Sequence, residues 1–215
     1  FMSLTSQQSR SLSLKKWKIR NLSTTWGFNL KILQWRGLFV NQYCLQKLKD
    51  KGINEFIELA KSLKGSNIEF FIAGDIDLGN PESLSFNELE NLKKLDYINY
   101  LGFVNIENEI HKYDVLVSLS AHEGFSRILL ESSFVGLYVV SFENSGTKFI
   151  SELENSKLIS NLNIDSFKEV LENLQETKLS LSNKNRDLIE RNYSSNEIAK
   201  QFNNIYKSIW WVIFR

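Results

Sequence analysis

Residues 115–136 read VLVSLSAHEGFSRILLESSFVG, and the pattern of apolar residues changes within this stretch. Val115–Leu119 is a short apolar run, which predicts a buried strand. Phe125–Val135 has the spacing of a helix, and Gly136 is the residue type that often ends one. The segment therefore predicts a strand, a loop and a helix, which is the repeating unit of an α/β fold.

The same alternation continues on both sides, and capping boxes at Ser85 and Ser194 mark two helix starts. Strands separated by helices indicate a parallel sheet with right-handed crossovers, so we expect a doubly wound, Rossmann-like α/β domain. The expected strands are Leu38–Cys44, Ile68–Ala73, Ile98–Leu101, Val115–Leu119 and Leu137–Ser141. The expected helices are Asn54–Leu63, Ser85–Leu95, Ile106–Tyr113, Phe125–Val135, Ser166–Leu174 and a last helix with Ile198, Phe202, Ile205 and Ile209 on one face.

The composition narrows the function classes. The 215 residues include one cysteine and two histidines, so a disulfide framework is excluded and metal ligands are sparse. No stretch of about 18 uncharged apolar residues occurs, which argues against a membrane-spanning helix. The sequence contains no GxxxxGK[ST] loop, no GxGxxG and no zinc-ligand spacing, which disfavours a P-loop NTPase.

Charge divides the chain unevenly, although the net charge is only +1. Nine Lys and Arg residues precede the first acidic residue, Asp50. Residues 1–36 are basic and fit the alternating pattern poorly. They could contact an anionic membrane surface, act as a transit peptide, or be a remnant, a linker or an artefact. Residues 37–208 form the expected domain, and residues 209–215 are an apolar tail.

Ligands of doubly wound sheets bind on the loops that follow the strands. In the loop after Val115–Leu119, Gly124 would let a ligand approach the backbone closely. The N–H groups of Phe125, Ser126 and Arg127 would point out of the helix N-terminus and form an anion site. The alternative interpretation is an ordinary glycine turn before a helix.

Two carboxylates flank this predicted anion site. Glu123 precedes the helix, and Glu131 lies about two turns into it. A carboxylate at the second position can accept hydrogen bonds from a ribose diol. The alternatives are a glutamate that complements the helix dipole and a solvated residue on the helix surface.

The segment resembles the Glu-x7-Glu signature of the retaining GT-B glycosyltransferases of family 4, the glycosyl transferases group 1, with Glu123 and Glu131 at that spacing. The resemblance covers residues 45–207 and corresponds to the C-terminal, donor-binding half of a GT-B fold, of the bacterial surface-polysaccharide type. The other matching motifs, in chain order, are Lys51-Gly52-Ile53, Phe71-Ile72-Ala73-Gly74, Asn80-Pro81-Glu82-Ser83, Tyr100-Leu101-Gly102-Phe103-Val104, Tyr113-Asp114-Val115 and Asn192-Tyr193-Ser194.

The resemblance implies a role for each matching position. Glu123 would lie near the donor sugar, and Lys51 would pair with the diphosphate and stabilise the leaving group; these two residues are the catalytic candidates. Glu131 would bind the nucleotide ribose. The remaining donor-binding candidates are Gly124, Phe125, Ser126, Gly102, Phe103, Val104 and Gly74.

The resemblance also implies the ligands. The donor would be a nucleotide-sugar, a UDP-linked hexose or N-acetylhexosamine, and the acceptor a glycan or lipid-linked sugar. No metal and no cofactor are expected, because Lys, Arg and the helix dipole would act on the diphosphate. The expected location is the cytoplasm, with peripheral contact at the inner membrane face. No nucleic-acid partner is expected.

Three departures from the family pattern leave other functions open. Gln46 stands where the family usually has an Arg, and Phe149 stands where it commonly has a Glu. The N-terminal acceptor-binding domain has no counterpart here, and His111 and His122 are poor substitutes for its catalytic-side His. The chain could therefore be a non-catalytic nucleotide-sugar-binding subunit that works with a separate N-terminal half, or an inactive gene fragment.

Overall fold

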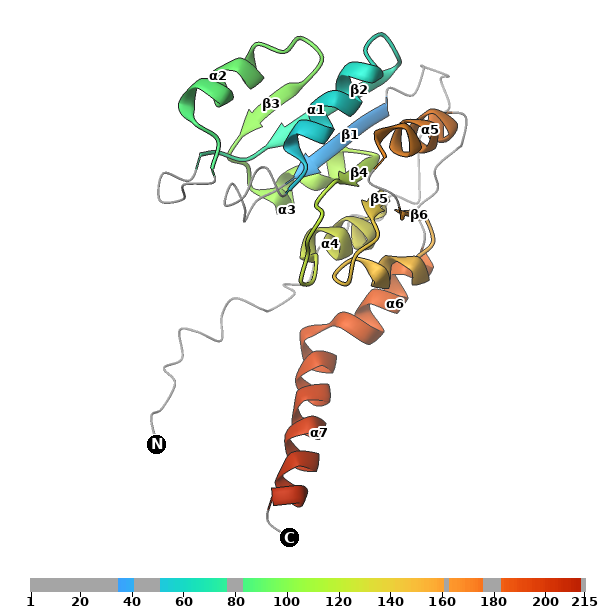
Figure 1. Ribbon diagram of the computed structural model, residues 1–215. Helices are drawn as coiled ribbons and strands as arrows, with labels where there is room; N and C mark the ends of the chain where they lie inside the picture. Colours follow the sequence, from blue (N-terminus) through green and yellow to red (C-terminus); the bar gives the residue numbers. More distant parts are fainter. Residues whose placement is uncertain (1–34, 41–50, 77–82, 161–162, 176–182, 214–215) are drawn as a thin grey trace. The chain divides into compact units, whose positions relative to one another are not determined.

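A computed structural model describes residues 35–40, 51–76, 83–160, 163–175 and 183–213 of the chain (Figure 1). The chain divides into two compact units. One unit is Ile32–Arg186, and the other contains Asp187–Arg215. The first unit carries the sheet and every predicted site residue that the structure describes.

The first unit is built on one sheet of six strands in the order β3-β2-β1-β4-β5-β6. Every neighbouring pair is parallel, which confirms the predicted doubly wound sheet. Its bounds are β1 Trp35–Val40, β2 Ile68–Ala73, β3 Asn99–Gly102, β4 Val115–Ser118, β5 Tyr138–Phe142 and β6 Ser156–Ile159.

Three predicted strands differ from the structure by one residue: β3 and β5 begin later, at Asn99 and Tyr138, and β4 ends earlier, at Ser118. The larger differences are at β1 and β6. β1 begins at Trp35, before the predicted Leu38, and the predicted residues 41–44 lie outside the described residues. β6 was not predicted, because Ser156–Ile159 is too short to show an alternation. It forms because Val139–Phe142 offers a parallel edge with which it pairs.

Each predicted helix is present in the structure, although its bounds differ, and η4 was not predicted (Figure 1). The capping box at the start of α2 is present, with Ser85 and Glu88 each bonded to the other's backbone N–H. Gly136 ends α4 in the left-handed conformation, at φ 98°. The bounds are α1 Ile53–Ser62, α2 Phe86–Lys93, α3 Ile106–Glu109, η3 Ile110–Lys112, α4 Arg127–Val135, η4 Lys148–Glu152, α5 Ile164–Gln175, α6 Asn183–Tyr193 and α7 Ser195–Ile213.

Helices α1 and α5 pack together over one face of the sheet. Phe56 of α1 meets Phe70 of β2 edge-on, and Phe167 of α5 meets Phe142 of β5 in the same way. Within β4, Val115 and Val117 belong to this core, so the intervening Leu116 and Ser118 face the opposite side. All four are buried, and β4 is therefore covered on both faces, as a central parallel strand should be.

Helix α6 was not predicted. Its sequence, NKNRDLIERNY, is strongly polar and lacks a clear apolar stripe. Its first turn is instead held by Asn185, whose side-chain oxygen accepts from the N–H of Glu154 at 2.7 Å and whose amide donates to the Glu154 carbonyl. Because Asn185 is almost fully buried, this tertiary contact overrides the weak local signal.

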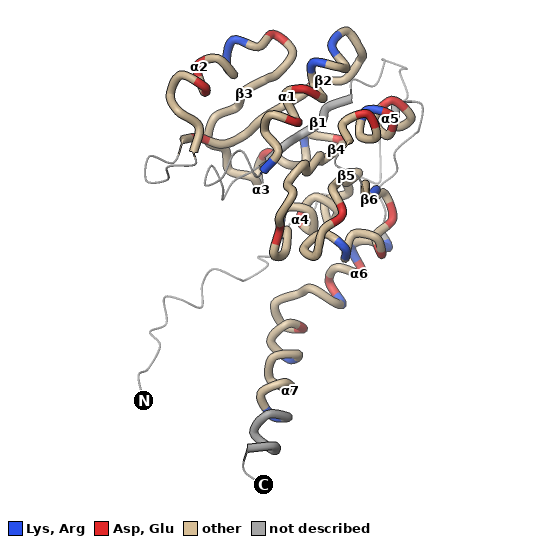
Figure 2. Tube along the Cα trace, viewed as in Figure 1, with Lys and Arg blue, Asp and Glu red and all other residues tan. Residues whose placement is uncertain are grey.

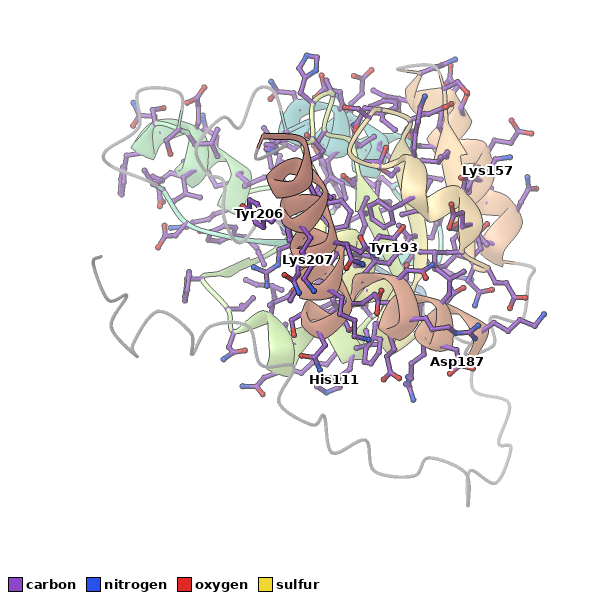
Figure 3. The ribbon with its side chains drawn as sticks, turned by 90° about the horizontal axis from the view of Figure 1, so that it is seen from below. His111, Lys157, Asp187, Tyr193, Tyr206 and Lys207 are labelled. Atoms are coloured by element: carbon purple, nitrogen blue, oxygen red, sulfur yellow. The ribbon has the colours of Figure 1, made fainter. Side chains whose placement is uncertain are left out.

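The second unit contains the end of α6 and all of the described α7. The Ser194 hydroxyl accepts from the N–H of Glu197 at 3.4 Å at the start of α7. Phe202 stacks on Tyr206 with the ring centroids 6.4 Å apart, and both are exposed; Tyr206 and Lys207 are adjacent on this helix (Figure 3). Residues 209–213 of the predicted tail continue the helix.

Charge and helix length bear on the membrane prediction. Acidic residues are spread along α1, α2 and α5 (Figure 2). Of the nine N-terminal basic residues, all but Arg36 lie outside the described residues. No helix in the described part of the chain has both the length and the apolar character that spanning a bilayer requires.

Candidate active site

The strand order places a topological switch point between β1 and β4. From β1 the chain proceeds outward through β2 to β3, and from β4 it proceeds the other way through β5 to β6. This reversal of direction is the switch point, and ligands of such sheets bind at the carboxyl ends of the strands beside it. Lys51 follows β1, and Glu123 follows β4.

Lys51 and Glu123 meet at this switch point. The Lys51 Nζ lies 2.7 Å from the Glu123 Oε1, although 72 positions separate the two residues. Their side chains are 15% and 20% exposed, so the ion pair is largely shielded from water. The structure thus brings together the two residues that the sequence predicts as catalytic.

Gly52 explains how Lys51 reaches this place. It caps α1 in the left-handed conformation, at φ 77°, and a Cβ there would lie 2.3 Å from the carbonyl oxygen of Leu119. Only glycine combines that backbone conformation with so close an approach. The start of α1 therefore contacts Leu119, the first residue after β4, and Lys51 lies beside the loop that holds Glu123.

The loop after β4 rests in turn on the loop after β5. A Cβ on Gly146 would lie 2.2 Å from the carbonyl oxygen of Glu123, so this contact also requires glycine. Gly124 has the opposite surroundings, since nothing lies within 4 Å of a Cβ placed there. The space on this side of the Gly124 backbone is therefore open, and the approach of a ligand to it stays a prediction.

The predicted anion site needs one correction. α4 begins at Arg127 and not at Phe125, because Ser126 has an extended backbone and its N–H donates to the Gly146 carbonyl at 3.3 Å. Ser126 is also buried. Its N–H is therefore engaged within the protein, and an anion at this helix would meet the N–H groups that follow, from Arg127 onward.

Glu131 lies on α4, half-exposed, and its Oε1 is 3.2 Å from Arg127. A pair of this kind, four residues apart on a helix surface, is weak.

The loops after β2 and β3 join at the neighbouring part of the same edge. The N–H of Gly74 donates to the Gly102 carbonyl at 2.8 Å, and the Tyr100 hydroxyl donates to the Gly74 carbonyl at 2.6 Å. Burial raises the pKa of the Tyr100 phenol, and the nearby Asp75 carboxylate raises it further, which keeps the phenol a donor. Phe103 is 72% exposed just beyond this junction, and Val104 is half-buried.

Three residues near Glu123 were missed or undervalued by the sequence reasoning: Asn144, Thr147 and Phe149. Asn144 and Thr147 shape the loop after β5, and the Asn-x-Gly spacing of residues 144–146 was the available signal. Phe149 stacks on Phe125 with the ring centroids 5.0 Å apart. The two histidines, His111 on η3 (Figure 3) and His122, are both exposed.

A family model now gives these positions a context. The model described as glycosyl transferases group 1 matches residues 43–195, which is most of the chain. The chain belongs to this family. A search of curated protein sequences found no match.

Solved structures agree with the glycosyl transferases group 1 assignment at the level of the fold, which is that of GT-B glycosyltransferases. Sucrose-phosphate synthase from Thermosynechococcus elongatus is similar with a TM-score of 0.68 and 17% identity, over 86% of this chain and 47% of that one. HepE from Anabaena in complex with UDP-glucose is similar with a TM-score of 0.64 and 18% identity, over 81% of this chain and 49% of that one.

A third similar structure is TarM, with a TM-score of 0.66 and 19% identity, over 80% of this chain and 35% of that one. The glycosyl transferases group 1 chain thus spans between about a third and a half of the length of the solved structures that it matches. Among the described residues, no three potential ligands cluster as a metal site would require.

Proposed function

We propose that this chain is the donor-binding half of a retaining family 4 glycosyltransferase that transfers a hexose or N-acetylhexosamine from a UDP-sugar. The observation that carries the proposal is the shielded Lys51–Glu123 ion pair at the switch point of the sheet. Similar structures include HepE bound to UDP-glucose and the lipopolysaccharide outer core galactosyltransferase WaaB, which supports a UDP-linked donor.

Each residue of the site binds a different part of the donor. Lys51 binds the diphosphate and stabilises the charge that develops as the sugar leaves. Glu123 faces the sugar, and in the free protein it keeps the Lys51 ammonium in place. Gly124 allows the diphosphate to approach the backbone. No metal or cofactor takes part in this proposal, because the cation and the N-terminus of α4 supply the positive charge.

The nucleoside end of the donor contacts the remaining donor-binding candidates. Glu131 accepts hydrogen bonds from the ribose. The joined loops at Gly74 and Gly102 present main-chain groups to the base, with the exposed Phe103 beside them. The acceptor is a glycan or lipid-linked sugar of surface-polysaccharide type, reached in the cytoplasm at the inner face of the membrane, where the basic N-terminal residues meet anionic lipid.

A second candidate is a nucleotide-sugar-binding subunit that is catalytic only with a partner. One similar structure is that of the GtfA/B complex, and this chain covers 36% of the matched chain, with a TM-score of 0.63. In that case a separate acceptor-binding half completes the enzyme. Transfer that appears only when such a half is added to the purified chain would favour this candidate.

The proposal predicts selective but weak nucleotide binding. Calorimetric titration of the purified chain should show that UDP and UDP-sugars bind more tightly than GDP or ATP. The affinity should be weak, because a half-site cannot enclose the ligand. Equal affinity for all four nucleotides, or none for any, would remove the donor-site assignment.

The two carboxylates are expected to differ in what they bind. Glu131→Gln should weaken UDP and UDP-sugar alike by about tenfold, because a hydrogen bond to a charged group contributes about 1.5–3 kcal/mol. Glu123→Gln should leave UDP affinity nearly unchanged and weaken the UDP-sugar. Calorimetry at fixed salt measures both. Equal effects of the two substitutions on UDP affinity would contradict the separate roles.

A further inference from the structure

The loop after β5 closes on itself through hydrogen bonds that its own side chains make. The Thr147 hydroxyl donates to the carbonyl of Phe142 at 2.6 Å and accepts from the N–H of Asn144 at 2.9 Å. The Asn144 side-chain oxygen accepts from the N–H of Gly146 at 2.9 Å. Thr147 is fully buried, so the loop is anchored to the core and can serve as a support for its neighbour.

Three contacts join this loop to the loop that carries Glu123. At the start, the Asn144 Nδ2 donates to the carbonyl of Ser120 at 3.2 Å. In the middle, Gly146 abuts the carbonyl of Glu123. At the end, the Ser126 N–H donates to the Gly146 carbonyl at 3.3 Å. Because these contacts lie at positions 120, 123 and 126, they support the whole loop.

We propose that Asn144 is a positioning residue for the donor site. Its side-chain amide holds the backbone of residues 120–126 where Glu123 meets Lys51 and Gly124 stays open. A neutral amide suits the task because it donates at one end, to the Ser120 carbonyl, and accepts at the other, from Gly146. Asn144 acts through this backbone and not on the reacting atoms. The nature of the ligand, UDP or a UDP-sugar, rests on the proposed function.

The substitution Asn144→Asp removes one of the two hydrogen bonds of this side-chain amide and keeps the other. The carboxylate can still accept from the Gly146 N–H, but it cannot donate to the Ser120 carbonyl, so two oxygens face each other. We expect amide hydrogen exchange at Ser126, measured by NMR, to become about tenfold faster. UDP affinity should fall about tenfold at a temperature at which circular dichroism shows the variant fully folded.

Two controls distinguish a local effect at this loop from a general effect on the protein. The amide of Gly74, which bonds to the Gly102 carbonyl at the same edge of the sheet, should keep its exchange rate. Asn163→Asp is the matched control, since the exposed Asn163 accepts from the N–H of Asp165 at 2.9 Å in a similar local turn. This control carries the same change of charge and should alter neither the exchange at Ser126 nor UDP affinity.

Several results would overturn the proposal: unchanged exchange at Ser126 in Asn144→Asp, equally faster exchange at Ser126 and Gly74, or faster exchange at Ser126 with unchanged UDP affinity. The second of these marks a general loss of stability. Failure of the unmodified chain to bind any nucleotide would overturn the proposed function instead, and exchange at Ser126 would still decide whether Asn144 holds the loop.

Discussion

Gly52→Ala is expected to lower the free energy of unfolding by about 2–5 kcal/mol. A left-handed backbone costs a residue with a Cβ about 1–2 kcal/mol, and forcing a methyl group into a filled site costs typically about 1–3 kcal/mol more. Here the methyl carbon would lie 2.3 Å from the Leu119 carbonyl oxygen, which belongs to the backbone and cannot rotate away. The midpoint of thermal unfolding should fall by roughly 4–20 °C.

Gly65→Ala is the matched control for that experiment. Gly65 also has a positive φ, of 91°, but nothing lies within 4 Å of a Cβ placed on it. It therefore isolates the backbone cost of about 1–2 kcal/mol from the steric cost at Gly52. If circular dichroism showed equal losses for the two variants, the start of α1 would not be held against β4 by this contact.

Lys51→Met is expected to weaken UDP binding at least about 30-fold. Truncating one partner of a shielded charge pair costs about 2–5 kcal/mol at a binding site, and the substitution also leaves Glu123 facing the diphosphate without its cation. Methionine keeps the length and the apolar stem of the side chain, so the packing changes little. Calorimetric titration with UDP measures the effect.

A second lysine–carboxylate ion pair of the same length provides a control for this result. Lys64 lies 2.7 Å from Asp96, but the two side chains are 54% and 71% exposed. Pairs in water contribute little, and Lys64 lies at the other end of α1, so Lys64→Met should leave UDP affinity unchanged. Equal losses in the two variants would mean that net charge, and not the position of Lys51, governs binding.

The sequence predicts best those elements whose signals are local. Ile68–Ala73 is a short, mostly apolar run and is strand β2 with the predicted bounds. Ser85 and Glu88 form the predicted capping box, because both partners lie within one turn. The strands predicted at Ile98 and Leu137 each begin one residue later in the structure, a shift that apolar runs alone cannot resolve.

The features that could not be predicted from the sequence depend on contacts between segments that are far apart in the chain. Ser126 has the composition of a helix start, but the Gly146 carbonyl takes its N–H and delays the helix. Asn185 gives no sign in the sequence that it will bond the backbone of Glu154. The roles of Lys51 and Glu123 stay predictions from resemblance. Their meeting at 2.7 Å, however, follows from Gly52, whose fit against Leu119 no pattern of residue types could have shown.

The strand order also has a kinetic consequence. β1 pairs with β2 and β4 with β5 after a single helical connection, whereas the pairing of β1 with β4 must close a loop that contains all of β2 and β3. Closing a long loop is entropically costly, and distant pairings slow folding. The join between β1 and β4 is therefore expected to form late. A ligand that binds across this join would therefore mainly slow unfolding. The lifetime of the folded chain would then increase with the fraction of sites that are occupied.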